Sequence, residues 1–197
     1  RIANPGCHAT AFVLLLRPLV QAGLLPADAA VSATSITGYS GGGKSMIAEY
    51  EQARQPGGDP RLGAPRPYGL ALAHKHLPEM QAHTGLARPP VFMPVVASYY
   101  KGLAVSVGLQ LDQFRSGTTA AQVQQALAAH YAGERFVRVK PLADADTLAG
   151  GFFDVQACND SNDAELFVFA NASQVLLRSR LDNLGKGASG AAVQNLQ

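Results

Sequence analysis

Closely spaced strand patterns in the second half of the chain constrain its fold more than any other feature. Four short segments rich in β-branched and aromatic residues are each bounded by Gly, Asn or Asp: Phe136–Val139, Phe152–Cys158, Glu165–Asn171 and Gln174–Leu181. Neighbouring segments are joined by connections too short for the crossover that parallel strands need. The second half is therefore predicted to form an antiparallel or mixed sheet.

The first half alternates helical and strand patterns. Asn4-Pro5-Gly6 reads as a turn, and the apolar residues after it, from Phe12 to Leu19, have the spacing of a helix. Further along, the sequence predicts a strand at 31–37, helices at 46–54 and 77–84, a β-rich span at 91–111, and a helix at 120–131 opened by a capping box at 119–122. This order favours an α+β fold over a doubly wound parallel sheet.

Composition excludes several classes of protein. Hydrophobic residues make up 47% of the 197 residues, enough for a core, and the formal net charge is only +2, without basic runs, so nucleic acid is not an expected partner. The longest apolar runs fall far short of the roughly 20 residues of a membrane span. A cytoplasmic protein is expected. The chain starts at Arg1 without an initiator methionine, which suggests a piece of something longer.

The stretch GYSGGGKS, Gly38 to Ser45, fits the phosphate-binding pattern G-x-x-x-x-G-K-[ST] between a strand and a helix. A nucleoside triphosphatase also needs an apolar strand ending in Asp to hold magnesium, and the apolar strands here end otherwise. Two interpretations stay open at this point: a phosphate-binding loop, or a glycine-rich turn with a surface lysine. The later GKGASG, 185–190, has too little chain after it for a dinucleotide fingerprint.

Cys7 is the first candidate for chemistry. It follows the Pro-Gly turn at the start of a predicted helix, where unpaired N–H groups and the helix dipole favour thiolate, and where an exposed, unpacked side chain is expected. Neither Cys7 nor Cys158 belongs to a C-x-x-C pair, and a reduced compartment is expected. Cys158 has no such setting and is interpreted as a structural cysteine.

The segment His74-Lys75-His76-Leu77-Pro78-Glu79 supplies a candidate base. His76 precedes a helix, and a carboxylate one turn later is placed to orient it as a general base for a thiolate. A metal site of His74, His76 and Glu79 lacks further ligands at the usual spacing, so no metal is predicted. His8, His83 and His130 are expected to be solvated or on helix faces.

Four motifs together resemble the N-acetyl-γ-glutamyl-phosphate reductase family, arginine-pathway relatives of aspartate-semialdehyde dehydrogenase. They are Asn4-Pro5-Gly6-Cys7-His8-Ala9-Thr10, the TGYSGGGK loop at 37–44, Tyr68 with HKHLPE at 74–79, and DNLGKGA at 182–188. They follow the family's order and span nearly the whole chain. The resemblance implies NADPH-dependent reduction of a small acyl phosphate to an aldehyde through an enzyme thioester.

The resemblance also implies roles for individual residues. Cys7 would be the nucleophile and His76 the acid/base, with Glu79 orienting His76 or contacting the substrate. The implied substrate-binding residues are Asn4, Tyr68, His74 and Glu79, and the implied cofactor contacts are Ser40, Gly41 and Gly42, through backbone N–H groups, and Asn183, Lys186 and Gly187. No metal belongs to this set.

The implied fold is α+β, a mixed and largely antiparallel sheet with helices on one face, like the C-terminal domain of glyceraldehyde-3-phosphate dehydrogenase. Residues 1–181 would form a catalytic and dimerisation domain, and residues 182–197 a C-terminal helix packing on an NADP-binding domain that precedes the motifs in the family and is absent here. A homo-oligomer, dimer or tetramer, is expected. Two other hypotheses remain: a phosphate-binding-loop phosphotransferase, and a dimerisation domain without catalysis.

Overall fold

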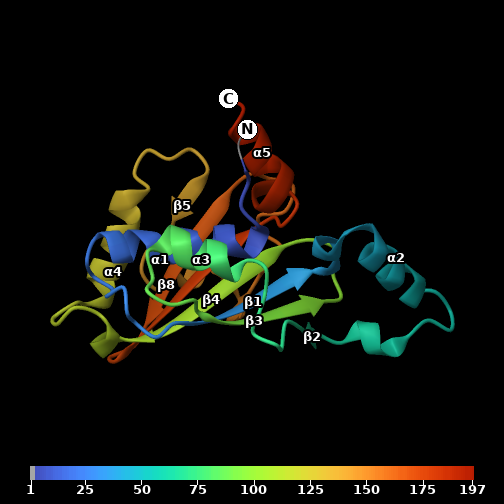
Figure 1. Ribbon diagram of the computed structural model, residues 1–197, viewed down its shortest axis with the longest axis horizontal. Coiled ribbons are helices and arrows are strands. Elements are labelled where there is room, and N and C mark those ends of the chain that lie inside the picture. Colours follow the sequence, from blue (N-terminus) through green and yellow to red (C-terminus); the bar gives the residue numbers. More distant parts are fainter. Residues whose placement is uncertain (1–2) are drawn as a thin grey trace.

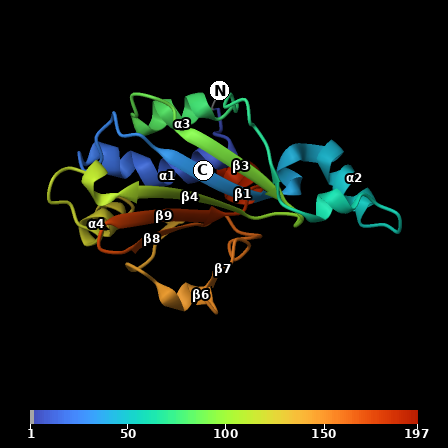
Figure 2. The same cartoon turned by 90° about the horizontal axis from the view of Figure 1, so that it is seen from below.

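A seven-stranded mixed sheet forms the frame of the molecule in the computed structural model, which describes residues 3–197 (Figures 1 and 2). The strand order is β2-β3-β1-β4-β9-β8-β5. The strands are β1 (Ser32–Gly38), β2 (Arg66–Pro67), β3 (Val91–Ala97), β4 (Leu103–Gln110), β5 (Val137–Val139), β8 (Ala164–Ala170) and β9 (Gln174–Leu181). A second, two-stranded sheet joins β6 (Leu148–Ala149) to β7 (Phe152–Phe153).

The pairing is mostly antiparallel. Strand β1 runs parallel to β3 and β5 runs parallel to β8, whereas β1–β4, β4–β9, β8–β9 and β2–β3 are antiparallel. The prediction of a mixed, largely antiparallel sheet in an α+β fold is therefore confirmed. The connection between the parallel strands β1 and β3 contains helices α2 and α3, whereas that between β5 and β8 contains a short 3₁₀ turn and the two-stranded sheet.

Helices α1 (Cys7–Gln21), α3 (Leu77–Thr84) and α4 (Ala120–His130) cover one face of the sheet (Figure 2). Helix α1 lies against β4, β8 and β9, and its apolar stripe from Phe12 to Leu19 is fully buried. Helix α4 begins at the predicted capping box, in which the Thr119 hydroxyl and the Gln122 side chain each accept the other residue's backbone N–H. These helices place the start of α1 and the start of α3 beside each other.

Helix α2 (Gly43–Ala53) extends beyond the sheet with the loop that follows it (Figure 1). A small second hydrophobic cluster packs against α2, and in it the rings of Tyr39 and Tyr50 stack with their centroids 4.6 Å apart. The short 3₁₀ turns of the chain are η1 (Tyr39–Gly42), η2 (Pro60–Gly63), η3 (Leu111–Gln113) and η4 (Ala145–Thr147). The glycine-rich stretch at 38–45 is thus a 3₁₀ turn leading into α2.

The predicted strand Phe152–Cys158 is wrong beyond its first two residues. Only Phe152–Phe153 is extended as β7, because the carboxylate of Asp154 accepts the backbone N–H of Gln156 at 2.8 Å and turns the chain. The guanidinium of Arg180 then holds the Asp154 carbonyl at 2.8 Å. A side-chain-to-backbone turn therefore replaced the strand that the apolar residues suggested.

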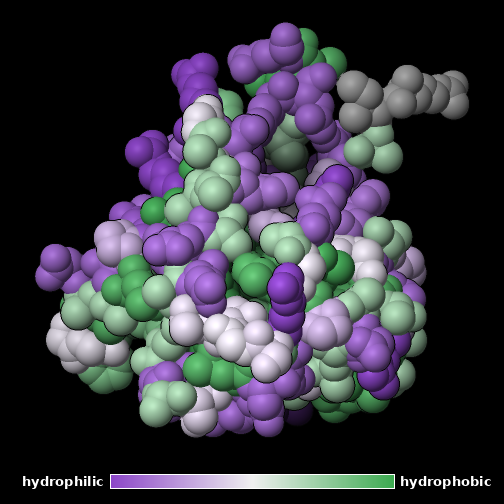
Figure 3. All heavy atoms as spheres, turned by 90° about the vertical axis from the view of Figure 1, so that its left-hand side faces the viewer, coloured by the Kyte–Doolittle hydropathy of each residue, from purple (hydrophilic) through white to green (hydrophobic). Residues whose placement is uncertain are grey.

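The closing segment returns to the start of the chain. It forms a π-helical turn, η5 (Gly185–Ser189), followed by α5 (Gly190–Gln194), and the amide of Asn195 donates to the Asn4 side chain at 2.7 Å. Asn4, near the start of the described chain, is thus in contact with Asn195 near its end. None of the described helices is long and apolar enough to cross a membrane. The end of the molecule that carries α4 mixes apolar and polar residues over its surface (Figure 3).

Candidate active site

One cavity of about 720 Å³ brings most of the predicted site residues together. It lies where the start of α1, the segment before α3, the glycine-rich turn and the closing segment meet. The predicted residues that line it are Asn4, Cys7, Ser40, Gly41, Gly42, Tyr68, His74, His76, Asn183 and Gly187. Glu79 and Lys186 are not among the residues that line this cavity.

Cys7 is the first residue of α1, and its thiol is half-buried instead of exposed as predicted. Gly187 packs so closely that a Cβ added there would lie 2.6 Å from the Cβ of Cys7. Burial raises the pKa of the Cys7 thiol, and the backbone N–H groups of His8 and Cys7 oppose this to a smaller extent. The predicted resting thiolate is therefore corrected: loss of solvent outweighs the helix terminus, and the thiol rests protonated.

His76 occupies the N-cap position of α3, and its side chain is only 7% exposed. Its ring lies directly against the residue before the cysteine, since a Cβ added at Gly6 would lie 2.0 Å from Nε2. Burial, followed by the charge of His74, lowers the pKa of His76 to about 4. The imidazole is thus neutral near pH 7 and is able to accept a proton.

Glu79 holds the backbone and not the histidine. Its carboxylate accepts the N–H of Gly6 at 2.8 Å, which fixes the chain immediately before Cys7. Among the described residues, the Nδ1 of His76 has no hydrogen-bond partner, so the prediction that Glu79 orients His76 through its ring is corrected. The carboxylate thus positions the segment that precedes Cys7, and it lies in the first turn of α3, where helix N–H groups are unpaired.

His8 is a site residue that the sequence analysis missed. Although expected to be solvated or on a helix face without a role, it is 3% exposed, with Nδ1 at 2.8 Å from Ser35 Oγ and Nε2 at 3.0 Å from Tyr68 Oη. Burial and the neighbouring His76 and His74 lower its pKa to about 3. One signal was available, because position 8 lies one turn before Phe12 on the buried stripe of α1.

Tyr68 and His74 complete this side of the cavity. Burial raises the pKa of Tyr68 to about 12, so its phenol stays a neutral hydrogen-bond donor. The Nδ1 of His74 accepts the backbone N–H of His76 at 3.2 Å, and burial lowers the pKa of His74 as well. All three imidazoles are therefore neutral at neutral pH. Three of the four residues predicted to bind substrate, Asn4, Tyr68 and His74, line the same cavity as Cys7.

Three backbone N–H groups of the glycine-rich turn are not available to bind a phosphate. The backbone N–H groups of Gly38, Tyr39 and Ser40 are already donated to carbonyl groups of the 99–102 turn, at 2.9 to 3.0 Å. The side chain of Lys44 is exposed and does not line the cavity. The N–H of Ser40 is thus not free for a cofactor, as had been predicted, whereas Gly41 and Gly42 do line the cavity.

Asn183 ties this turn to the closing segment. Its amide donates to Ser40 Oγ at 3.0 Å, and its carbonyl accepts the N–H of Gly102 at 2.8 Å. Lys186 points elsewhere: its ammonium donates to Gln194 at 2.7 Å and lies over the ring of Phe136. The predicted cofactor contact of Lys186 is therefore not one that this arrangement provides.

Solved structures share this fold. Aspartate semialdehyde dehydrogenase II from Vibrio cholerae superposes with a TM-score of 0.70 over 98% of this chain and 60% of that one, at 21% identity. Aspartate semialdehyde dehydrogenase from Francisella tularensis gives a TM-score of 0.73, covering 98% of this chain and 63% of that one, at 14% identity. At these identities the likeness establishes the fold alone, which this chain shares with about three-fifths of each of these two proteins.

Sequence comparison gives the family. The model of the semialdehyde dehydrogenase dimerisation domain matches residues 7–183, and the chain belongs to this family. Among curated proteins, it is 50% identical to N-acetyl-gamma-glutamyl-phosphate reductase from Burkholderia ambifaria and 47% identical to N-acetyl-gamma-glutamyl-phosphate reductase 2 from Pseudomonas putida. Both matches cover 100% of this chain and 61% of the relative. The chain thus spans about three-fifths of the relatives' length.

Proposed function

We propose that this chain carries the catalytic residues for the NADPH-dependent reduction of N-acetyl-γ-glutamyl phosphate to N-acetylglutamate 5-semialdehyde. The observation that carries the proposal is the meeting of Cys7, at the start of α1, and His76, at the start of α3, in one cavity. The names of relatives that are about half identical support the same substrate. The division into residues 1–181 and 182–197 remains part of this proposal.

In the first step, the Cys7 sulfur attacks the acyl carbon of the substrate. A carbon–sulfur bond forms, the bond from the acyl carbon to the phosphate oxygen breaks, and the thiol proton passes to the neutral imidazole of His76. Because Cys7 and His76 are both neutral at rest, the thiol proton is removed only after the substrate has bound. Glu79 contributes by fixing the backbone of Gly6 next to the nucleophile.

The second step acts on the thioester, and NADPH, when bound, would supply the hydride that reduces its carbonyl carbon. The carbon–sulfur bond then breaks, and the imidazolium of His76 returns its proton to the Cys7 sulfur as the aldehyde leaves. The residues that fit the nicotinamide end are Gly41 and Gly42, whose lack of side chains leaves room, with Met46 and Ala188 as apolar neighbours along the same cavity. The exposed Val193 and Leu196 of the closing segment suit contact with a nucleotide-binding domain.

We also infer that the chain forms a homo-oligomer. The sheet face opposite α1 exposes large apolar side chains, with Val91 49%, Met93 45% and Leu176 38% exposed, and the family is described as a dimerisation domain. Light scattering coupled to size-exclusion chromatography tests this. An Arg substitution at Met93 should shift a dimer toward monomer, whereas a chain that is monomeric at all concentrations contradicts the inference.

The acylation step is tested without cofactor. The chain is mixed with N-acetyl-γ-glutamyl phosphate and examined by intact-mass spectrometry, followed by peptide mapping. One N-acetylglutamyl group on Cys7 is expected, with release of one inorganic phosphate, since thioester formation needs no hydride. The adduct should be lost in Cys7→Ser, slowed in His76→Gln, and retained in Cys158→Ser and in His83→Gln, which changes an exposed histidine outside the cavity.

The outcomes separate the alternatives. Magnesium-dependent ATP binding that is lost in Lys44→Ala and unaffected by Cys7→Ser would replace the proposal with the phosphotransferase hypothesis. A folded chain that forms no adduct, alone or together with the N-terminal part of a relative, and whose Cys7 reacts like an ordinary thiol, would support the non-catalytic dimerisation hypothesis.

A further inference from the structure

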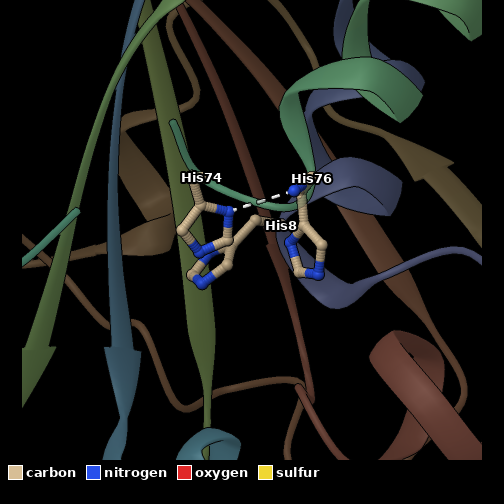
Figure 4. Close-up of side chains that lie close together, drawn as sticks. All are labelled: His8, His74 and His76. Atoms are coloured by element: carbon tan, nitrogen blue, oxygen red, sulfur yellow. Dashed lines mark hydrogen bonds between the residues drawn. The ribbon is translucent and has the colours of Figure 1, made fainter. Parts of the chain in front are cut away.

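Three imidazole side chains from separate segments meet in the cavity. His8 comes from α1, His74 from the loop before α3, and His76 from the N-cap of α3 (Figure 4). One ring nitrogen from each lies within 4.8 Å of the others, and the ring centroids of His74 and His76 are 4.8 Å apart. The sequence disfavoured a metal site of His74, His76 and Glu79 because it offered no further ligands at the usual spacing. The fold supplies His8 from α1.

A buried polar atom at this place lacks a partner. Among the described residues, the Nδ1 of His76 makes no hydrogen bond, although the residue is only 7% exposed. Buried polar atoms in native proteins nearly always have a partner, and a bound water or ion is one that would satisfy this nitrogen. Figure 4 shows one ring nitrogen of His76 on the side of the ring turned toward His8 and His74. The unpaired atom is thus aimed into the cluster.

We propose that His8, His74 and His76 bind one divalent transition-metal ion, with Zn²⁺ as the best-fitting cation. Three imidazoles without a carboxylate match the preferences of zinc, copper and nickel, and not those of magnesium or calcium. Tetrahedral zinc with bonds of about 2.0–2.1 Å places its nitrogen ligands about 3.4 Å apart, which the rings reach by turning inward. The fourth position faces the cavity, so water fills it.

His8 is already held as metal ligands usually are. Its Nδ1 lies 2.8 Å from the hydroxyl of Ser35, which is 0% exposed on β1, and this contact fixes the plane of the ring. A second polar group behind a ligating histidine of this kind sets the ring's orientation and raises its basicity. The Nε2 of His8 currently meets the hydroxyl of Tyr68 at 3.0 Å. Metal binding displaces that hydroxyl.

The effect of a bound metal on catalysis rests on the proposed function, whereas the metal site itself does not. A metal held by His76 occupies the imidazole that accepts the Cys7 proton. Occupancy therefore inhibits acylation of Cys7 reversibly, and a chelator restores it. Failure of the acylation experiment would leave the metal site standing, because metal binding is measured directly.

Zinc affinity is measured by competition with a chromophoric chelator, using chain first stripped with EDTA. We expect one Zn²⁺ per chain, more than about 100-fold weaker binding in His8→Gln and His74→Gln, and about 10- to 100-fold weaker binding in Ser35→Ala. Cys7→Ser should bind as the unaltered chain does. His83→Gln and His130→Gln, at exposed positions on α3 and α4, are the matched controls and should also leave affinity unchanged.

Cobalt substitution gives a second, independent measurement. Bound Co²⁺ should show the visible bands of a four-coordinate site without thiolate-to-cobalt charge transfer. His74→Gln keeps the test valid if His8→Gln, which lies deeper, fails to fold. Zinc affinity unchanged in His74→Gln overturns the proposal. It is equally overturned by a strong thiolate band together with loss of binding in Cys7→Ser, because the metal would then be held by the cysteine.

Discussion

Gly187→Ala tests the packing that buries Cys7. The added Cβ would lie 2.6 Å from the Cβ of Cys7, and 3.3 Å from both the Cys7 Cα and the Asp182 carbonyl oxygen. To reach 3.4 Å, the lower end of ordinary contact, the two Cβ atoms must separate by 0.8 Å, the difference between 3.4 and 2.6. Both lie at rigid positions, the first turn of α1 and η5. Overpacking of this kind costs about 1–3 kcal/mol.

The assay is urea unfolding together with the rate at which iodoacetamide alkylates Cys7. We expect a lower unfolding midpoint at constant m-value, a melting temperature lower by roughly 2–12 °C, and a changed alkylation rate because the thiol is displaced. Gly63→Ala is the matched control, since a Cβ there meets nothing within 4 Å and the backbone is not left-handed. If Gly187→Ala matches Gly63→Ala in both measurements, the close packing of Gly187 on Cys7 is refuted.

Three further predictions concern pH and hydrogen bonding. Burial raises the pKa of Cys7 above 9.0, so less than about 1% of this cysteine is thiolate at pH 7. The rate at which Cys7 is alkylated, measured in Cys158→Ser, should therefore still be rising at pH 9. A rate that reaches a plateau below pH 8 would contradict this prediction. His8 has an ordinary pKa of 6.5 and a folded pKa of about 3. The unfolded chain therefore binds the proton first as pH falls, so about 2 kcal/mol of stability should be lost between pH 7 and 5, and His8→Gln, compared in EDTA, should lose less. Asn183→Ala should lower stability by about 1–3 kcal/mol, seen as a reduced urea midpoint at constant m-value, because it leaves a buried N–H unpaired.

Local sequence signals predicted most of the fold. Helix α3 and strand β9 have the predicted bounds, and the capping box at Thr119 opens α4 as expected. In each case the information lies within a few residues, as helical period, alternation or a cap. The segment 152–158 failed because its apolar residues suggested a strand, while the outcome depended on the Asp154 side chain and on Arg180 from a distant strand.

The site residues that belong to a local sequence motif could be predicted, whereas those whose role depends on tertiary contacts could not. Cys7 and His76 follow from position at helix starts, and the structure does bring them to one cavity. The partner of Glu79, the direction of Lys186 and the burial of His8 depend on residues brought together only by folding. A helix terminus predicts an activated cysteine, but Gly187 removes the solvent that would stabilise the thiolate.

The protonation of Cys7 and His76 at rest shapes how this site would work. The ordinary thiol pKa of 9.0 already lies 5 above the value of about 4 for His76, and burial raises the thiol further. Moving the proton before attack would cost on the order of 7 kcal/mol, before the attraction of the resulting ion pair is counted. Proton transfer must therefore be coupled to formation of the carbon–sulfur bond, or follow binding of an anion that stabilises the imidazolium. An acyl phosphate, the substrate proposed above, would bring such an anion, so its binding would favour the charged state of His76 and promote deprotonation of the thiol.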